Sequence, residues 1–149
     1  NMVLERHNEE TFGKGIALDL EKIKEFSQKL IDEFDIRPAE CADHQAAGLS
    51  GGNQQKVIIA REVSSNPDVL IAIQPTRGLV GAIEFVHKAL IRERDRGAAI
   101  LLISFELDEI MDVADKMAII YAGKNVGEFD QGTITEEQAG LLMAGGDAE

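Results

Sequence analysis

Uninterrupted apolar runs that alternate with amphipathic segments constrain the fold of this chain more than any other feature. The runs are "VLIAI" (69–73), "AAILLIS" (98–104) and "KMAIIYAG" (116–123). Each is short and predicts a strand, and the first two are predicted to be buried. Continuous apolar strands separated by helices are typical of a mostly parallel sheet covered on both faces. The sequence therefore predicts an α/β fold from about Pro67 onward, with a helical portion before it.

The segments between these runs carry helix signals. Residues 81–96 predict an amphipathic helix that Gly97 ends, and 106–114 predict another helix. The inward residues of the first of these are expected to be Ile83, Val86 and Leu90. A long helix is expected to begin at Asp19 as its N-cap and to end before Arg37-Pro38.

The two ends of the chain give weaker signals. The first dozen residues are polar and predict a frayed lead-in. Near the other end, "NVGEFD" (125–130) predicts a hairpin partner for the third strand. Thr135 and Gln138 predict a capping box for a last helix over residues 136–144.

Charge and composition exclude several classes of partner. Twenty-seven acidic residues against fifteen Lys plus Arg give a formal net charge of -12, which argues against nucleic acid as a partner. The single Cys41 excludes an internal disulfide, and three scattered histidines predict no metal site. No apolar run approaches the ~20 residues of a membrane span. No secretion signal is visible in the residues given, and the start at Asn1 is expected to be a cut through a longer protein.

The stretch "LSGGNQQK" (49–56) precedes a second predicted helix, which follows Gly52 and ends near Ser65. Ser50 can offer a hydroxyl, and Gly51 and Gly52 can offer unhindered backbone N–H groups. The helix dipole adds partial positive charge there, which favours a phosphate oxygen. Ser-Gly-Gly is equally an ordinary loop and N-cap, so the tripeptide alone leaves both interpretations open.

Three segments in order carry a family resemblance: "LSGGNQQK", "NPDVLIAIQPTRGL" (66–79) and "ILLISFELDEIMDVADKMAIIYAGK" (100–124). Over nearly its whole length the chain resembles the ATP-binding subunit of an ABC transporter. The "NQQ" variant with "QPTRGL" is similar to the second half of the tandem ATPases of simple-sugar or nucleoside importers. The resemblance implies a partial P-loop NTPase fold. Residues 1–48 would be part of the helical subdomain and its loop, and residues 49–149 would be the signature helix and the C-terminal part of the RecA-like core.

In that family the signature of one nucleotide-binding domain closes over an ATP held by the phosphate loop of another. The resemblance thus implies ATP with Mg²⁺ in the complete assembly, transmembrane permease subunits, and a peripheral place on the cytoplasmic face of the membrane. The residues implied to meet the partner's ATP are Ser50, Gly51, Gly52 and Gln54. No G-x-x-x-x-G-K-[ST] occurs, so the phosphate-loop portion is missing and the isolated chain is not expected to bind ATP tightly.

The chain departs from the family around its own ATP site. The family has Asp-Glu before Pro-Thr, where this chain has Ile73 and Gln74, and the switch His is replaced by Phe105. The Asp of the following loop is deleted before Val80. Isoleucine cannot engage a hydrated cation and an amide is no general base. The chain's own site is therefore expected to be hydrolytically dead, with Ile73 as a core residue and Gln74 as a polar turn residue.

Three alternatives stand beside this interpretation. An active ATPase would need a carboxylate in place of Gln74, and only Glu106 is near it in sequence. A relative from DNA repair or chromosome structure would need coiled-coil insertions and a basic surface, and the chain shows neither. The third alternative is a nucleotide-free interaction module, which the sequence leaves open.

Overall fold

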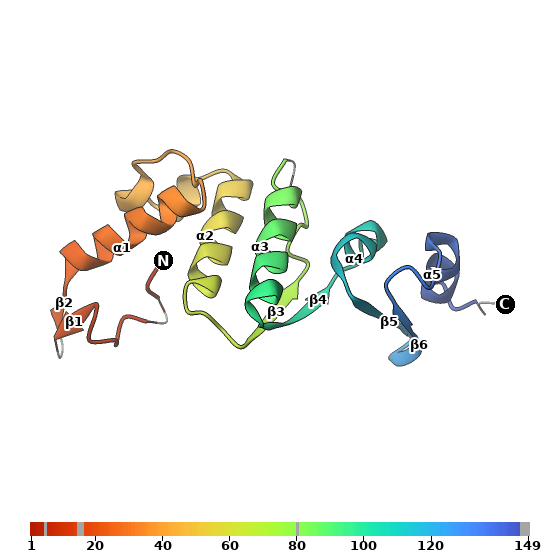
Figure 1. Cartoon of the computed structure of the whole chain (residues 1–149). Coiled ribbons are helices and arrows are strands. Elements are labelled where there is room, and N and C mark those ends of the chain that lie inside the picture. Colours follow the sequence, from red (N-terminus) through yellow and green to blue (C-terminus); the bar gives the residue numbers. More distant parts are fainter. Residues whose placement is uncertain (5, 15–16, 80, 147–149) are drawn as a thin grey trace. The chain divides into compact units, whose positions relative to one another are not determined.

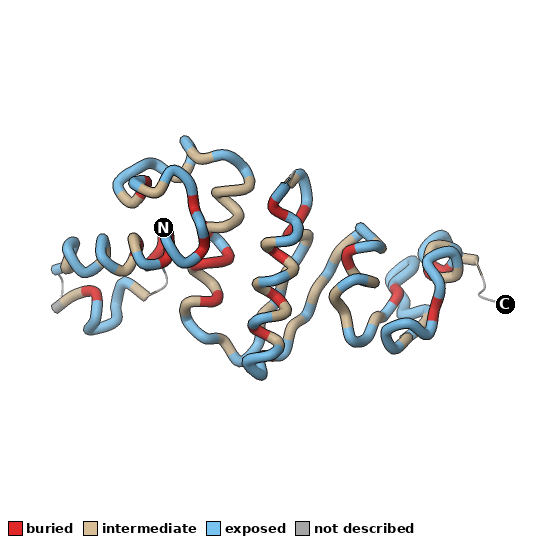
Figure 2. Tube along the Cα trace, turned by 45° about the horizontal axis from the view of Figure 1, so that its top comes forward, coloured by how far each residue is buried: buried red, intermediate tan, exposed pale blue. Residues whose placement is uncertain are grey.

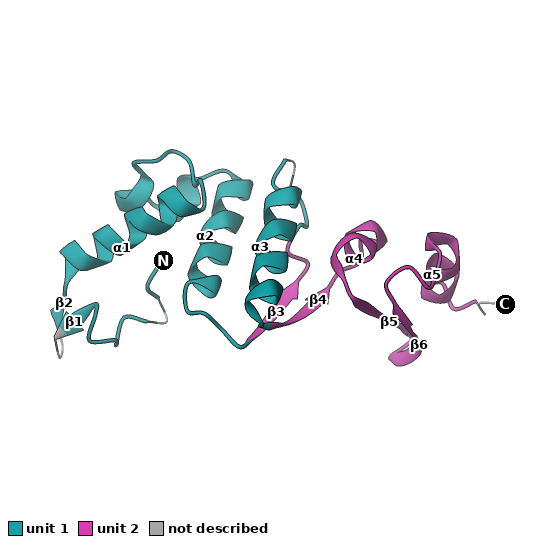
Figure 3. Ribbon diagram, viewed as in Figure 1, with its two compact units in different colours: residues 1–68, 76–98 teal, residues 69–75, 99–149 magenta. Residues whose placement is uncertain are grey.

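The computed structural model describes residues 1–4, 6–14, 17–79 and 81–146 (Figure 1). It divides into two compact units (Figure 3). Unit 1 comprises Asn1–Asp68 and Thr76–Ala98, and unit 2 comprises Val69–Pro75 and Ala99–Glu149. The subdomain boundary expected after residue 48 follows the family resemblance and stays a prediction.

Most of the first dozen residues of unit 1 are exposed, but a buried contact fixes the segment, so the predicted frayed lead-in is wrong. Phe12 is 1% exposed, and its ring meets the ring of Phe26 edge-on at 5.0 Å between centroids. The Arg6 guanidinium lies 5.4 Å from the centroid of Phe12 and 5.2 Å from that of Phe26. A short antiparallel pair, β1 (Gly13–Lys14) and β2 (Ala17–Leu18), follows. The buried ring of Phe12, through its contacts with Phe26 and Arg6, holds this polar segment in place. The polar composition of the segment does not predict these contacts.

The helix boundaries of unit 1 follow local signals in the sequence. The first helix, α1 (Leu20–Glu33), begins at Asp19, whose carboxylate accepts a hydrogen bond from the backbone N–H of Lys22 at 3.1 Å. Two 3₁₀ turns, η1 (Cys41–Asp43) and η2 (Ala46–Gly48), lead to α2 (Gly51–Val63). The third helix, α3 (Ile83–Arg96), ends at Gly97, which has φ of 107°. The predicted N-cap and helix stop are thus confirmed.

The core of unit 1 lies between its three helices, where α2 contacts both α1 and α3. Buried positions recur along the helices in Figure 2, and Val86 and Leu90 of α3 are among them as predicted. Ile83 is 43% exposed, so its predicted inward place is wrong. It is the first residue of α3, and the buried residues of this helix begin at Val86.

Unit 2 contains the parallel strands. The strand β3 (Val69–Ile73) pairs in parallel with β4 (Ala99–Ile103), with Ile73 opposite Ile103. After α4 (Leu107–Val113), β5 (Lys116–Tyr121) pairs antiparallel with β6 (Lys124–Asp130), which confirms the predicted hairpin. The α/β class is therefore confirmed. Among the described residues, parallel pairing is confined to β3 and β4.

The last helix packs on this hairpin. Thr135 and Gln138 form the predicted capping box at the start of α5 (Glu136–Met143), which contacts β5 and α4. Ala139 and Leu142 of α5 are buried with Ile119 of β5. Of the helices that the structure describes, none has the length and apolar character needed to cross a membrane.

The strands β3 and β4 are not buried throughout, contrary to the prediction. Exposed and half-buried positions alternate along both strands. The exposed set consists of Val69 at 62%, Ile71 at 58%, Ile73 at 65%, Leu101 at 53% and Ile103 at 43%. Alternate residues of a strand point to opposite faces, so one face of this pair lacks cover among the described residues. An apolar run predicts a strand but does not establish what covers it.

Candidate functional site

Ser50 is the N-cap of α2 and lies exposed at the start of that helix. Its Oγ accepts a hydrogen bond from the backbone N–H of Asn53 at 3.4 Å and one from Asn53 Nδ2 at 3.0 Å. The residue therefore holds the extended conformation of an N-cap, with φ of -61° and ψ of 155°. The predicted interpretations of an N-cap and a phosphate contact are compatible at this position, because the hydroxyl remains accessible.

Gly51 and Gly52 form the first turn of α2, where backbone N–H groups have no partner within the helix. A Cβ added to Gly51 would meet nothing within 4 Å. One added to Gly52 would lie 3.5 Å from Ala82 Cβ, an ordinary contact, and neither glycine has a positive φ. Neither backbone conformation nor packing among the described residues requires glycine here. The pair leaves the end of a helix open to close approach.

Hydrogen bonds and an ion pair from neighbouring side chains stabilise the start of α2. Gln54 Nε2 donates to the carbonyl oxygen of Leu49 at 2.8 Å, so its amide folds back onto the preceding loop. Lys56 Nζ donates to the carbonyl oxygen of Asp35 at 2.7 Å and lies 3.4 Å from its carboxylate. Arg37 first, and Lys56 second, lower the pKa of the Asp35 carboxyl group below its ordinary value. The turn after α1 is thereby tied to the signature helix.

A second connection joins the same two segments and was not predicted. The backbone N–H of Arg37 donates to Asn53 Oδ1 at 2.8 Å. No signal in the sequence could have shown it, because the two residues are 16 positions apart and the contact depends on how α1 packs on α2. Asn53 thus joins the candidate site through a contact that the sequence does not predict.

The positions expected to be degenerate, Ile73, Gln74 and Phe105, lie in unit 2 at the carboxyl ends of β3 and β4. Gln74 has φ of 50° and its backbone N–H donates to the carbonyl oxygen of Ile103 at 2.8 Å. Its buried Nε2 has no hydrogen-bond partner among the described residues. Ile73 is 65% exposed, so its prediction as a core residue is wrong. The apolar face on which it lies is the uncovered one.

Phe105 follows β4 and is 77% exposed. The next residue, Glu106, donates its backbone N–H to Ser104 Oγ at 3.0 Å as the chain enters α4. Val80, before which a loop Asp is predicted to be deleted, lies outside the described residues. Within the described ranges no group of three or more His, Cys, Asp or Glu side chains could hold a metal ion. With Ile73 and Gln74 in place of carboxylates, this edge does not fit Mg²⁺.

Cys41 is buried in η1, and burial raises the pKa of its thiol. The thiolate is the reactive form of cysteine. The structure therefore offers no activated nucleophile at this position.

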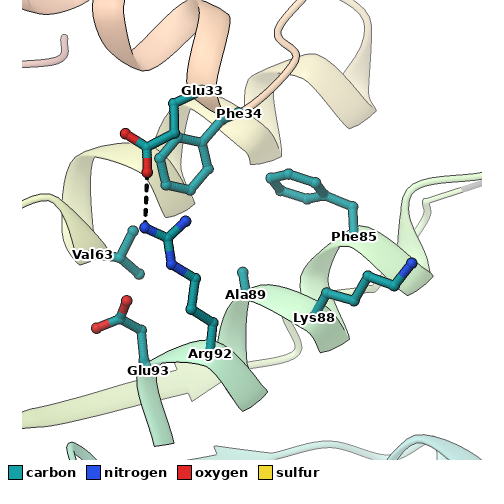
Figure 4. A pocket seen from close by; sticks show the side chains of 8 residues that line it. All are labelled: Glu33, Phe34, Val63, Phe85, Lys88, Ala89, Arg92 and Glu93. Carbon is teal, nitrogen blue, oxygen red and sulfur yellow. Dashed lines mark hydrogen bonds and ion pairs between the residues drawn. The ribbon is translucent and has the colours of Figure 1, made fainter. Parts of the chain in front are cut away.

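A cavity of about 130 Å³ lies elsewhere in unit 1, between α1, the C-terminal end of α2 and α3 (Figure 4). Phe34 and Val63 form part of its wall, and Arg92 Nη2 lies 2.9 Å from Glu33 Oε1 at its side. The volume would suit one ring or branched side chain. Because Val63 is the last residue of α2 and Ser50 precedes its first, the cavity is separate from the signature.

Comparison with solved structures defines the fold. The chain is similar to an ATP-binding cassette of an ABC transporter, with a TM-score of 0.65, 22% sequence identity, and coverage of 89% of this chain and 50% of that one. It is also similar to a dimeric bacterial ABC transporter cassette, with a TM-score of 0.61, 20% identity, and coverage of 82% and 52%. The fold is therefore part of an ABC ATPase fold.

Comparison with curated proteins is closer in sequence, although no family model matches the chain. The nucleoside import ATP-binding protein NupA of Lactococcus lactis subsp. cremoris is 50% identical over 148 residues, which are 98% of this chain and 29% of that protein. The guanosine import ATP-binding protein NupO of Bacillus subtilis is 48% identical over 146 residues, 97% of this chain and 28% of that protein. The chain thus spans under a third of the length of these relatives. It is similar in sequence to a segment of these import ATP-binding proteins.

Proposed function

We propose that the chain is the C-terminal part of the second nucleotide-binding domain of a tandem ATPase that serves a simple-sugar or nucleoside importer. In this role it supplies its signature to an ATP held by another nucleotide-binding domain. The observation that carries the proposal is the open helix start at Ser50, Gly51 and Gly52. Glycine lowers helix stability relative to alanine, by up to ~1 kcal/mol in a helix interior. Neither glycine is needed by the described structure, so close approach of an outside anion explains both.

The residues present fit the terminal phosphate of such an ATP. The Ser50 hydroxyl can donate to a phosphate oxygen, and the N–H groups of Gly51 and Gly52 add donors at the positive end of the helix dipole. Bound ATP and its Mg²⁺ would supply the phosphoryl group and the metal charge. Gln54 stands further back, since its amide is engaged by Leu49, and its role would be to hold the loop before Ser50.

The site nucleated by this domain itself is proposed to be hydrolytically dead. Ile73 and Gln74 supply neither a ligand for a hydrated cation nor a base, and Phe105 supplies no imidazole. Permease subunits and a peripheral place at the cytoplasmic face of the membrane belong to the same proposal. The net charge of -12 argues against nucleic acid as a further partner.

The test is Ser50→Arg in the full-length tandem ATPase. Arginine would fill the space of the terminal phosphate and remove the hydroxyl donor. Loss of one transition-state donor typically costs ~3 kcal/mol, about a hundredfold in rate, and a blocking side chain costs more. Steady-state hydrolysis should therefore be lost, while equilibrium ATP binding by the partner's phosphate loop is retained.

Ser65→Arg is the matched control, because Ser65 is exposed just beyond the other end of α2. Its turnover should equal that of the wild type. Unchanged turnover in Ser50→Arg would overturn the proposal and would favour the nucleotide-free interaction module.

A further inference from the structure

The side-chain amide of Asn53 has a defined orientation. Its Oδ1 lies 2.8 Å from the backbone nitrogen of Arg37, and its Nδ2 lies 3.0 Å from Ser50 Oγ. A backbone N–H can only donate, so the amide atom that faces Arg37 must be the oxygen. The NH₂ group must then face Ser50. The assignment follows from the backbone and does not depend on telling nitrogen from oxygen within the amide.

This orientation limits what the Ser50 hydroxyl can do. A hydroxyl has two acceptor lone pairs and one donor hydrogen. Among the described residues, the hydrogen bonds to Ser50 Oγ come from Asn53 alone, through its Nδ2 at 3.0 Å and its backbone N–H at 3.4 Å. Both bonds use the oxygen as acceptor. The hydrogen is left for an acceptor outside this network.

We propose that Asn53 is a positioning residue that turns the Ser50 hydroxyl into a dedicated donor to the phosphate of the partner-bound ATP. The inference rests on the proposed function. A phosphate oxygen only accepts hydrogen bonds, so a hydroxyl that presented a lone pair would repel it. By occupying the lone pairs, Asn53 excludes that orientation before ATP arrives, which is electrostatic preorganisation.

The backbone group that fixes the orientation of the Asn53 amide belongs to Arg37, which lies outside the signature. Arg37 follows α1, and the same turn holds Lys56 through the carbonyl oxygen of Asp35 at 2.7 Å. The direction of the Ser50 hydroxyl therefore depends on the packing of α1 beside α2. Displacement of this turn would release the amide and allow the hydroxyl to rotate without any change in the glycines.

Asn53→Asp tests the proposal in the full-length ATPase. A carboxylate can still accept from Arg37 but cannot donate to Ser50, so the serine hydroxyl donates to it and turns a lone pair toward the phosphate. Turnover should fall about tenfold or more, as expected for a lost hydrogen bond to a charged group. Equilibrium ATP binding in the open state should not change.

Asn53→Ala distinguishes a role in orienting the Ser50 hydroxyl from a role in stabilising the structure. Alanine loses the contact with Arg37 but leaves the hydroxyl free to rotate toward phosphate, so its turnover should exceed that of Asn53→Asp. A merely structural role predicts the reverse order, because aspartate keeps the Arg37 bond and favours the start of a helix. Gln55→Glu is the charge-matched control on the same helix and should leave turnover within about twofold.

A double-mutant cycle with Ser50→Ala decides whether Asn53 acts through the hydroxyl. If it does, Asn53→Asp should add little to the loss already caused by Ser50→Ala. Full additivity would overturn the inference and would assign the effect to direct repulsion by the new carboxylate. If Ser50→Ala itself leaves turnover unchanged, the proposed function fails first, and the two failures are thus distinguishable.

Discussion

At the scale of the residue, the glycines of the signature offer the sharpest separation of stability from function. Gly51 has no positive φ, and a Cβ there would meet nothing within 4 Å. Gly51→Ala should therefore keep or raise the thermal midpoint of the protein, since alanine favours the helix by up to ~1 kcal/mol. The same methyl group would narrow the approach of the phosphate, so ATP turnover of the full-length protein should fall.

The control for Gly51→Ala is Gly48→Ala. Gly48 also has no positive φ and has open space where a Cβ would lie, but it belongs to η2, before the signature. Its substitution should leave turnover unchanged. A lower thermal midpoint for Gly51→Ala would show that the glycine serves the fold, which would contradict a phosphate contact as the reason for glycine at this position.

At the scale of the element, the turn after α1 should make stability depend on pH. The pKa of the Asp35 carboxyl group is lowered by Arg37, and further by Lys56. The pKa of an aspartate in the unfolded chain is about 4. Because the folded-state pKa is lower, the ion pair stabilises the fold fully at pH values above the unfolded-state pKa. This stabilisation is lost as the pH falls through the folded-state pKa. Asp35→Asn should therefore lower the thermal midpoint slightly at pH 7, because the pair is exposed.

Asparagine suits this test because Asp35 has φ of 48°, and asparagine tolerates that region nearly as well. The difference between wild type and Asp35→Asn should shrink as the pH is lowered from about 5 to about 2, through the range in which a carboxylate with a lowered pKa takes up its proton. A difference that persists at the lowest pH would contradict the ion-pair explanation and would point to backbone strain.

Elements could be predicted from the sequence where their signals are local. Asp19, Gly97 and Thr135 mark helix ends through contacts within a few residues, and each acts as predicted. The strands were recognised for the same reason, as short apolar runs. The predictions of burial are wrong at Phe12, which is buried, and along β3, where alternate residues are exposed. Burial depends on which distant segment packs against a residue, and local sequence does not show this.

In the candidate site, too, the residues of a contiguous motif could be predicted, whereas the contacts that depend on packing could not. Ser50, Gly51 and Gly52 were recognisable because the signature is contiguous in the sequence. The bond from Arg37 to Asn53 spans 16 positions and exists only once α1 and α2 are packed. The placement of Ile73 on an uncovered face is likewise a product of the sheet pairing and not of its own neighbours in sequence.

At the scale of the whole molecule, the uncovered face of β3 and β4 should govern how this polypeptide behaves in isolation. Its exposed members are Val69, Ile71, Ile73, Leu101 and Ile103. Contiguous apolar surface and unpaired strand edges favour association, and we expect this effect to outweigh the repulsion from a net charge of -12. The 149-residue polypeptide should therefore form dimers or larger species, measured by sedimentation velocity over a range of concentrations.

Ile71→Lys identifies the surface responsible. Ile71 is 58% exposed at the centre of β3, so lysine can extend into solvent there with little loss of packing, and its charge opposes pairing of two such faces. The variant should sediment as a monomer with an unchanged circular dichroism spectrum. Ile58→Lys is the matched control, because Ile58 is 43% exposed but lies on α2 in unit 1, and it should associate like the wild type. A wild-type polypeptide that is monomeric at all concentrations, or equal dissociation by both lysine variants, would show that the β3–β4 face does not drive association.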